Sequence, residues 1–403
     1  MSGLKNWVST GFLLLSVVYC LGGCGAKNQD PSPPLNPFGE TTPGFSEESN
    51  LYVMSYNLHN LFDTQHDIEE GVDKNDIEFL PFSFPDKVKK CDQMNSGNSY
   101  YADMCKKTDW TAEKLNYKLG VIRKVVLHKE RIPDILGTVE IENRNVAQML
   151  ADRIGYKTFV MTKGPDKRGI DVALFYNPDK LELIEETHIA MRAPEYSGKP
   201  TRDSLLVHFQ LKDKPGQVLA VSLNHWPSQG NSDESRTEVA KVVMEEVASK
   251  REKYLLESWV KDYHFIMMGD FNTVRDDRPH PFNDVVLNGQ WGTPVSDIET
   301  LRNAEFPNHE DPAGSYFYRP RADWNKLDRF FVSQSLVDKK GTDIMVDSFH
   351  IVHEDFMMRD FEIRDNGRVI KTIKIPNGFR HEKNRLEDMG VSDHLPIEVK
   401  IGY

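Results

Sequence analysis

Basic charge is scarce in this sequence. Its 50 Lys and Arg residues stand against 62 Asp and Glu residues, which leaves a formal net charge of −12 at pH 7. Proteins that coat nucleic acid by bulk electrostatics usually carry a strongly basic surface, so the composition argues against that class. A polyanionic ligand would have to be met by a local basic patch or by metal ions.

The apolar stretch near the N-terminus is too short to be a stable membrane anchor. Residues 11–19 are largely apolar and follow Lys5, but a spanning helix needs about 20 such residues. The pattern indicates an export signal that is removed. It ends in Leu21-Gly-Gly-Cys24, and small residues leading into a cysteine resemble the lipobox of a bacterial lipoprotein. We expect residues 1–24 to be a lipoprotein signal peptide and Cys24 to be lipidated, with ordinary secretory cleavage as the alternative.

Cysteine is also rare, with four residues in the chain. Cys20 and Cys24 belong to the signal segment, which leaves Cys91 and Cys105 in one polar segment. In an exported chain such a pair favours a disulfide, because the compartment is oxidising. A zinc site is disfavoured, because no further cysteine or suitably spaced histidine nearby completes a set of four ligands.

Residues 25–50 lack the apolar side chains that packing requires. They are polar and contain prolines at positions 31, 33, 34, 37 and 43, a composition typical of disordered linkers. We expect a tether that holds a folded domain off a membrane, with the chain lipid-anchored at the bacterial outer membrane or cell surface. This anchor is the membrane contact that we expect, and the sequence predicts no protein partner.

Short β-type runs and helical patterns alternate from Leu51 onward. Residues 51–58 predict a strand, apolar residues at helical spacing predict a helix over 115–126, and residues 133–140 predict another strand. Further elements are predicted as strands at 171–176, 205–211, 218–224 and 265–268 and as an amphipathic helix at 235–259. The alternation is typical of one α/β or α+β domain, which we place at residues 51–403.

Two segments differ from this alternation. Asp63–Thr108 and Glu354–Asp388 are polar and rich in charge. We expect them to be long insertions or loops rather than parts of the core. Loops of this kind often carry binding residues, so we expect substrate choice to be determined there.

Several predicted strands end in carboxylate, amide or imidazole groups. Such ends place polar groups on a shared rim, where a hard cation such as Mg²⁺ finds oxygen ligands. The side chains concerned are Asn57, Glu140, Glu142, His225, Asp270, Asn272, Asp328, Asp393 and His394. Taken singly, Asn57 is more often a turn former, and His225 is more often a structural histidine. Strand alternation places Glu140 and Glu142 on one face, where they could share a cation or cap a solvated strand end.

The most specific pattern is Ile266-Met-Met-Gly-Asp-Phe-Asn272. An apolar strand breaks at Gly269 and presents Asp270 and Asn272 two residues apart. The glycine permits a tight backbone, and the two polar side chains emerge side by side for metal and phosphate.

In their order along the chain, these residues resemble the motifs of the endonuclease/exonuclease/phosphatase superfamily, which includes the pancreatic-type deoxyribonucleases. The matching elements are Asn57, Glu140, Gly-Asp-Phe-Asn at 269–272, Asp328 and Ser-Asp-His-Leu-Pro at 392–396. The resemblance runs from about Leu51 to Tyr403. It implies a four-layer sandwich of two mixed β-sheets, face to face, with helices outside.

The same resemblance implies a role for each matching residue. Asn57, Glu140 and Asp393 correspond to ligands of Mg²⁺ or Mn²⁺, with Ca²⁺ as a further alternative. Asp270 and Asn272 correspond to the pair that holds the phosphate and either the attacking water or a second metal.

The histidines and the arginine are assigned in the same way. His394 corresponds to the catalytic histidine, which Asp328 orients, and His225 corresponds to the second histidine of the deoxyribonuclease-like branch. Arg202 falls where that branch places a phosphate-binding arginine. Among the other cations that could contact a nucleic-acid backbone, we select Arg168 as a second phosphate-binding residue; the rest are Lys163, Lys167, Arg275, Arg319 and Arg321.

Two departures from the family pattern concern His225 and His59. The acid that supports the second histidine in the pancreatic-type enzymes has no clear equivalent, although Asp171 could take that role. The position two residues after Asn57, where some abasic-site repair members carry an acid, is His59. This departure and export both argue against abasic-site repair.

The sequence therefore predicts a divalent-metal-dependent phosphodiesterase, with DNA or RNA as the expected substrate. One alternative is an enzyme acting on nucleotides, inositol phosphates or lipid headgroups, because the same chemistry serves all of them and loops select the substrate. Another is a binding protein that has lost catalysis, which the intact set of acids and histidines disfavours.

Overall fold

The computed structural model describes residues 43–46, 48–69, 72–190 and 201–403. Cys24, the predicted signal peptide and the predicted tether up to residue 42 lie outside these residues. The end of that predicted tether is packed: Phe45 pairs with Ile132 in a β-bridge, and its ring centroid lies 5.7 Å from that of Tyr156. The folded unit therefore begins before residue 51, because the phenyl ring of Phe45 has apolar surface to bury.

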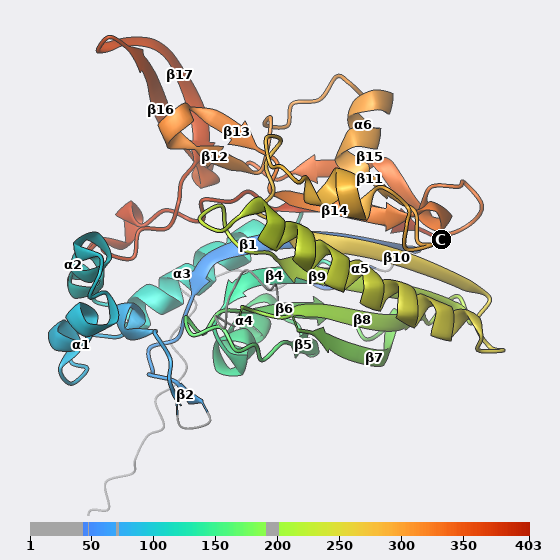
Figure 1. Cartoon of the computed structure of the whole chain (residues 1–403), viewed down its shortest axis with the longest axis horizontal. Coiled ribbons are helices and arrows are strands. Elements are labelled where there is room, and N and C mark those ends of the chain that lie inside the picture. Colours follow the sequence, from blue (N-terminus) through green and yellow to red (C-terminus); the bar gives the residue numbers. More distant parts are fainter. Residues whose placement is uncertain (1–42, 47, 70–71, 191–200) are drawn as a thin grey trace, which may run out of the picture. The chain divides into compact units, whose positions relative to one another are not determined.

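Two six-stranded sheets form the centre of the folded unit (Figure 1). The first has the order β15 (Asp343–Ile351), β18 (Ile397–Gly402), β1 (Asn50–Leu61), β4 (Ile135–Ile141), β6 (Asp171–Tyr176) and β5 (Phe159–Met161). The second has the order β11 (Val295–Asp297), β14 (Asp328–Ser333), β10 (Asp262–Asp270), β9 (Gln217–His225), β8 (Ser204–Leu211) and β7 (Leu181–Ile189). Both sheets are mixed, because β1 and β4 are parallel, as are β9 and β10, and the other neighbours are antiparallel.

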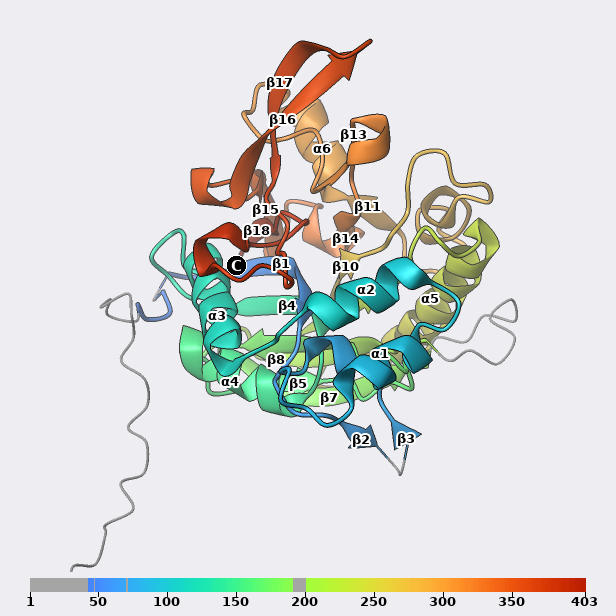
Figure 2. The same cartoon turned by 90° about the vertical axis from the view of Figure 1, so that its left-hand side faces the viewer.

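The sheets pack face to face, and helices cover their outer faces. At Gly137 of β4, a Cβ would lie 2.5 Å from Cε of Met268 in β10, so a glycine there lets the two sheets approach closely. Helices α3 (Ala112–Val126) and α4 (Arg144–Ile154) lie on one flank and α5 (Asp233–Leu255) on the other, as Figure 2 shows. The predicted four-layer sandwich of two mixed sheets and flanking helices is confirmed.

The helices follow the apolar spacing in the sequence. In α3, the predicted inner residues Leu115, Leu119, Ile122 and Val126 are buried, and Thr111 caps the N-terminus by accepting from the backbone N–H of Lys114. In α5, Val239, Val243 and Val247 are buried against the second sheet. Full burial of one such side chain contributes about 1.5–3 kcal/mol, so these apolar faces fix both helices.

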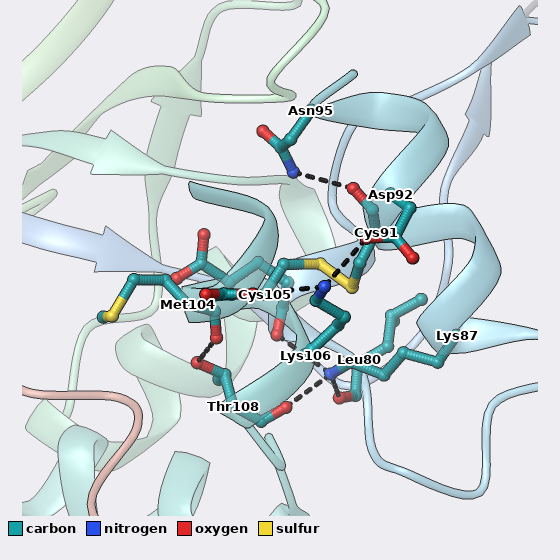
Figure 3. Close-up of a disulfide and its surroundings, with 11 residues drawn as sticks. Leu80, Lys87, Cys91, Asp92, Asn95, Met104, Cys105, Lys106 and Thr108 are labelled. Carbon is teal, nitrogen blue, oxygen red and sulfur yellow. Dashed lines mark hydrogen bonds and ion pairs between the residues drawn. A yellow bond between two sulfur atoms is a disulfide. The ribbon is translucent and has the colours of Figure 1, made fainter. Parts of the chain in front are cut away.

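The segment Asp63–Thr108 is more regular than the loop that we expect from its sequence. It contains β2 (Ile68–Glu69), β3 (Val72–Asp73), a 3₁₀ turn at Ile77–Phe79, α1 (Lys87–Met94) and α2 (Ser99–Lys107). Figure 3 shows the disulfide between Cys91 of α1 and Cys105 of α2, the pair for which the sequence favours a disulfide. Their apolar cluster is small, with Ile77 and Leu80 buried beside the two cysteines. The covalent bond and the buried Lys87, whose Nζ donates to the carbonyls of Glu78 and Thr108, hold the helices together.

The segment Glu354–Asp388 likewise contains regular structure. Strands β16 (Met358–Asp365) and β17 (Arg368–Pro376) form a hairpin that projects from the sandwich (Figure 1). A lone hairpin is marginally stable, and this one is fixed by the contact of Phe361 with Phe317, whose ring centroids are 5.3 Å apart. Phe317 lies on β12 (Tyr316–Tyr318), which pairs with β13 (Asp323–Asn325). The last α-helix of the described residues is α6 (Ile298–Glu305). Among the described residues, no helix combines the length and apolarity needed to cross a membrane.

Candidate active site

The polar ends of β9 and β10 are fixed side by side by the parallel pairing of these strands. The register places Gly269 opposite Asn224 and Asp270 opposite His225. Gly269 has a φ of 131°, and a Cβ there would lie 1.9 Å from the carbonyl oxygen of Asn224. Only glycine allows this approach, so the glycine of the Gly-Asp-Phe-Asn element brings Asp270 up to His225.

Replacing Gly269 by Ala is expected to lower the free energy of unfolding by about 3 kcal/mol or more, because a steric clash is added to an unfavourable φ. Gly289→Ala is the matched control: Gly289 also has a positive φ of 72°, but a Cβ there meets nothing within 4 Å. The destabilisation at Gly289 should stay at about 1–2 kcal/mol, the cost of a left-handed conformation for a residue with a Cβ. Urea unfolding measures both, and equal destabilisation would show that the close approach to Asn224 does not matter.

Asn57 and Glu140 reach the same place from the first sheet. The Nδ2 group of Asn57 donates to Oε1 of Glu140 at 3.3 Å and to Oδ2 of Asp270 at 3.0 Å. Glu140 Oε2 accepts from the backbone N–H of Asn60 at 2.9 Å. Asn57, Glu140 and Asp270 therefore form one hydrogen-bonded group that joins the two sheets.

Glu140 and Glu142 do not share a face, contrary to the alternation expected from the sequence. Glu140 has a φ of 61°, and the pairing of β4 with both of its neighbours, β1 and β6, shifts in register between Val139 and Ile141. This irregularity turns Glu140 toward Asn57, whereas Glu142 accepts from the backbone N–H of Asp63 at 2.8 Å. Glu142 also accepts from Nδ2 of Asn143 at 3.3 Å, so it belongs to a separate cluster. Burial next to Asp63 raises the pKa of Glu142 to about 10.

His394 is held by Asp328 as the family resemblance implies. Its Nδ1 lies 2.7 Å from Oδ2 of Asp328, which also accepts from the hydroxyl of Ser315 at 2.6 Å. The other ring nitrogen, Nε2, lies 3.7 Å from Oδ2 of Asp270. Burial disfavours the charged ring, but the charges of Asp328 and Asp270 outweigh it and raise the pKa of His394 well above its usual value.

His225 faces the same carboxylates, but Asp171, the residue that could have served as its supporting acid, is not hydrogen-bonded to it. Its Nε2 lies 3.7 Å from both Glu140 Oε1 and Asp270 Oδ2. Its buried Nδ1 has no hydrogen-bond partner among the described residues. Asp171 accepts instead from Thr162 Oγ1 at 2.7 Å and from the N–H of Gly164 at 2.8 Å. Burial and the nearby charge of Arg202 lower the pKa of His225 well below its usual value, so the ring is neutral.

Arg202 and Asn272 shape the turn that follows His225. Arg202 is buried and donates from Nε to the carbonyl of His225 at 2.9 Å and from Nη2 to that of Trp226 at 2.8 Å. Its Nη1 pairs with Asp166 at 3.3 Å. Asn272 donates from Nδ2 to the carbonyl of Trp226 at 3.0 Å. In this structure, Arg202 holds protein carbonyls at the position where the sequence predicts a phosphate contact.

Lys118 is a component of the site that the sequence did not reveal to us. It is buried on α3, and its Nζ donates to the carbonyls of His59 and Asn60 at 2.5 and 2.7 Å. Burial lowers the pKa of Lys118 to about 7. The two residues that it holds both have positive φ, and Asn60 in turn donates to Glu140. The signal was a lysine between Leu115 and Leu119 on the apolar face of a predicted helix.

The donor atoms at the centre fit a divalent cation. Ligand atoms of Asp270, Asp328 and His394 all lie within 4.8 Å of one another, and Oδ1 of Asp328 is buried without a hydrogen-bond partner among the described residues. Burial raises the pKa of Asp270 to about 7, a cost that a bound cation would offset. A second group, Asp311, His350 and His353, also has this spacing, but Asp311 is already paired with Arg302 at 2.6 Å.

Asp393 and Arg168 lie at the opening of the site. The side chain of Asp393 is 35% exposed, and its Oδ1 lies 3.3 Å from Nδ1 of His59. Asp393, His59 and the exposed Arg168 line a cavity of about 1130 Å³. Asp393 therefore borders this cavity, whereas the buried Asn57 and Asp270 and the partly buried Glu140 form the floor of the site.

Comparisons with known proteins agree with this geometry. The model described as the Endonuclease/Exonuclease/phosphatase family matches residues 86–402. A search of curated proteins found no sequence match. Among solved structures, the chain is similar to ANGEL2, described as a 2′,3′-cyclic phosphatase, with a TM-score of 0.50 and 12% identity over 87% of this chain and 95% of that one.

Two further solved structures are similar to this chain at slightly lower scores. One is a humanized TDP2 from D. rerio, with a TM-score of 0.48 and 16% identity over 88% of this chain and all of that one. The other is a mannosyl-6-phosphatase from Bacteroides thetaiotaomicron, with a TM-score of 0.47 and 16% identity over the same shares. At these identities the likeness concerns the fold alone.

Proposed function

The chain belongs to the endonuclease/exonuclease/phosphatase family, and from this premise we propose that it is an exported nuclease that hydrolyses phosphodiester bonds of DNA or RNA. Hydrolysis of phosphoester bonds is the activity of the family. The observation that supports the proposal is the convergence of Asn57, Glu140, His225, Asp270 and His394 on one point between the sheets.

Enzymes of this family depend on a divalent metal, and the donor set here fits one. From the family resemblance we assign the ion to Asn57, Glu140, Asp270 and Asp393. Of these, Asp270 is the residue shared with the cluster of Asp270, Asp328 and His394, whose ligand atoms lie within 4.8 Å of one another. We take the ion to be Mg²⁺ or Mn²⁺, with Ca²⁺ as the alternative. When bound, the ion would neutralise charge on the phosphoryl oxygens and the leaving oxygen. Oxygen donors are what these hard cations prefer, and the described residues around Asp270 offer carboxylates and an amide.

The chain's own groups divide the remaining work. Asp328 occupies Nδ1 of His394, so Nε2 is the nitrogen that faces the reacting phosphate. The raised pKa favours the imidazolium, and Nε2 then donates a hydrogen bond to a phosphoryl oxygen. Asp270 orients the attacking water and accepts its proton, and the leaving oxygen takes a proton from solvent. His225 is neutral and adjacent, and its carbonyl is fixed by Arg202, so it completes the wall around the nucleophile.

The proposal includes location. The disulfide of α1 and α2 suits an oxidising compartment, and the residues preceding Cys24 resemble a lipobox, so we place the enzyme at the bacterial cell envelope on a lipid anchor. Labelling of bacteria that express the full chain with radioactive palmitate tests the lipid anchor. A mature chain that carries no label would remove it from the proposal.

The test of function is a polymer-cleavage assay on the folded domain. Plasmid DNA and RNA are incubated with Mg²⁺, Mn²⁺ or Ca²⁺, and in parallel with a chelator. We expect cleavage with at least one ion and none with the chelator, because the reacting phosphate then lacks its counter-charge. If phosphate or headgroup is released from nucleotides, inositol phosphates or lipids while both polymers stay intact, the proposed function changes from nuclease to phosphoesterase acting on small substrates.

A further inference from the structure

The cavity beside Asp393 has walls that come in part from the two insertions. One wall is α2 of the segment Asp63–Thr108, and the other combines β12, the turn that follows it and residues after β17. At about 1130 Å³ the cavity exceeds the roughly 300–1,000 Å³ typical of pockets for small ligands. It therefore has room for more than the phosphoryl group at the catalytic centre.

The α2 wall presents two aromatic rings. Tyr100 and Tyr101 are 66% and 56% exposed, and their ring centroids lie 5.5 Å apart. The side chain of Asn98 caps the helix beneath them, and the disulfide at Cys105 fixes its other end to α1 (Figure 3). Tyr316 and Tyr318 line the same cavity. Exposed aromatic rings on a rigid support are a platform for stacking planar groups.

The opposite wall is cationic. Arg319 and Arg380 line the cavity, and Arg359 is close enough that the charges of both lower its pKa, after burial as the largest cause. Among the described residues, no ion pair is formed by any of these three, although other arginines such as Arg236 and Arg302 are paired with acids. The buried Nε atoms of Arg359 and Arg380 have no hydrogen-bond partner in the same part of the chain. Glu78, Glu382 and Asp393 also line the cavity, but none of them forms an ion pair with these three arginines in the described part of the chain. The unpaired guanidinium groups therefore offer donors to an anion.

We propose that this cavity binds the stretch of single-stranded polynucleotide next to the scissile phosphate. Bases stack on Tyr100 and Tyr101, and backbone phosphates lie at Arg319 and Arg380. The inference rests on the proposed nuclease function and adds a preference within it. A single strand is selected because its bases are free to stack on protein rings, whereas a duplex already stacks its bases internally.

The experiment compares three substrates: a single-stranded oligonucleotide, its duplex, and bis(p-nitrophenyl) phosphate. The wild type should prefer the single strand. Tyr100→Ala with Tyr101→Ala should lower kcat/KM for the single strand about 5- to 150-fold per base unstacked and leave that for the small diester unchanged. Phe82→Ala is the control, because Phe82 is also 56% exposed but lines a different cavity.

The cationic wall is tested through salt. Removing Arg319 or Arg380 should lower the slope of log(kcat/KM) against log[salt] for the single strand by about 0.7 for each phosphate that is no longer neutralised. Arg385→Ala is the control, because Arg385 is exposed and paired with Glu387 at 2.9 Å. Replacing both Cys91 and Cys105 by Ala should act like the tyrosine variant, since it releases the helix that carries the rings.

The outcomes separate this inference from the function beneath it. A wild type that hydrolyses the small diester but no polymer refutes the nuclease. A wild type that cuts polymers while the tyrosine variant cuts the single strand equally well refutes the binding groove. A tyrosine variant whose activity falls equally on the single strand and on the small diester shows that α2 stabilises the fold of the site and does not bind the polynucleotide. Circular dichroism spectra of the variants identify any that fail to fold.

Discussion

His394→Ala is expected to lower kcat/KM for phosphodiester hydrolysis by about 10²–10⁴-fold. The substitution removes the nitrogen that faces Asp270 and the phosphate, and it leaves Asp328 without the ring it holds. Because the imidazolium interacts with charge that builds up in the transition state, the decrease should fall on kcat more than on KM. Steady-state kinetics on bis(p-nitrophenyl) phosphate with saturating metal measure it.

His128→Ala is the matched control for this substitution. His128 is also a histidine beside an acid, with Nε2 3.3 Å from Glu398 Oε2, but it lies after α3 and outside the site. Its removal should lower the unfolding midpoint and leave kcat/KM within about threefold of the wild type, because it touches none of the reacting groups. If both substitutions lowered kcat alike, His394 would be acting through the fold, and the assignment of its role would fail.

Local chemistry explains which parts of the site the sequence could predict. Gly269 lies where two strands approach closely, and Asp270 and Asn272 follow it within three residues. The sequence could predict this part of the site because its residues are neighbours in the chain. The pairing of His394 with Asp328 spans 66 residues, and only the family pattern joined them. The sequence offers no clear supporting acid for His225, and Asp171, which could have taken that role, instead accepts from Thr162 and Gly164 in the structure.

Backbone irregularities account for much of what the sequence did not predict. Strand alternation predicts that Glu140 and Glu142 lie on the same face, but the positive φ at Glu140 interrupts the alternation. Glutamate has no preference for this conformation, so the residue type did not predict it. Lys118 stabilises the matching irregularity at His59 and Asn60 from another element. The two segments were expected to be insertions or loops because they are polar and rich in charge. Helices α1 and α2 form nevertheless, since the disulfide and Lys87 take the place of a large core.

Asp270→Asn is expected to reduce kcat/KM by about 10³-fold or more, because it removes a proton acceptor and a metal ligand together. The shape of the side chain is conserved, so the fold should persist. Metal affinity should fall by about tenfold or more, and isothermal titration with Mn²⁺ measures it. Activity within about tenfold of the wild type would remove Asp270 from the catalytic set.

The same variant should be more stable than the wild type when metal is chelated, and the gain should depend on pH. Burial, with the charges of Asp328 and Glu140, raises the pKa of Asp270 to about 7, whereas an unfolded chain keeps it near 3.8. The unfolded state therefore releases its proton first as pH rises, so Asp270 destabilises the fold increasingly from about pH 4 to pH 7 and constantly above. An asparagine at this position does not titrate, so the advantage of the variant should be absent near pH 4 and reach a few kcal/mol at about pH 8.

Asp134→Asn gives the opposite sign and completes the test. Asp134 is buried too, but Lys180 pairs with it at 3.3 Å and Asn177 donates to it at 2.8 Å, so its charge is compensated. Neutralising it should lower stability at about pH 8, because Lys180 is left buried beside an uncharged amide. Urea unfolding of both variants in chelator, at about pH 4.5 and pH 8, compares them. The two acids differ in their neighbours. Asp134 is neutralised by Lys180, whereas the charge of Asp270 is offset only in part, by His394, until a cation binds.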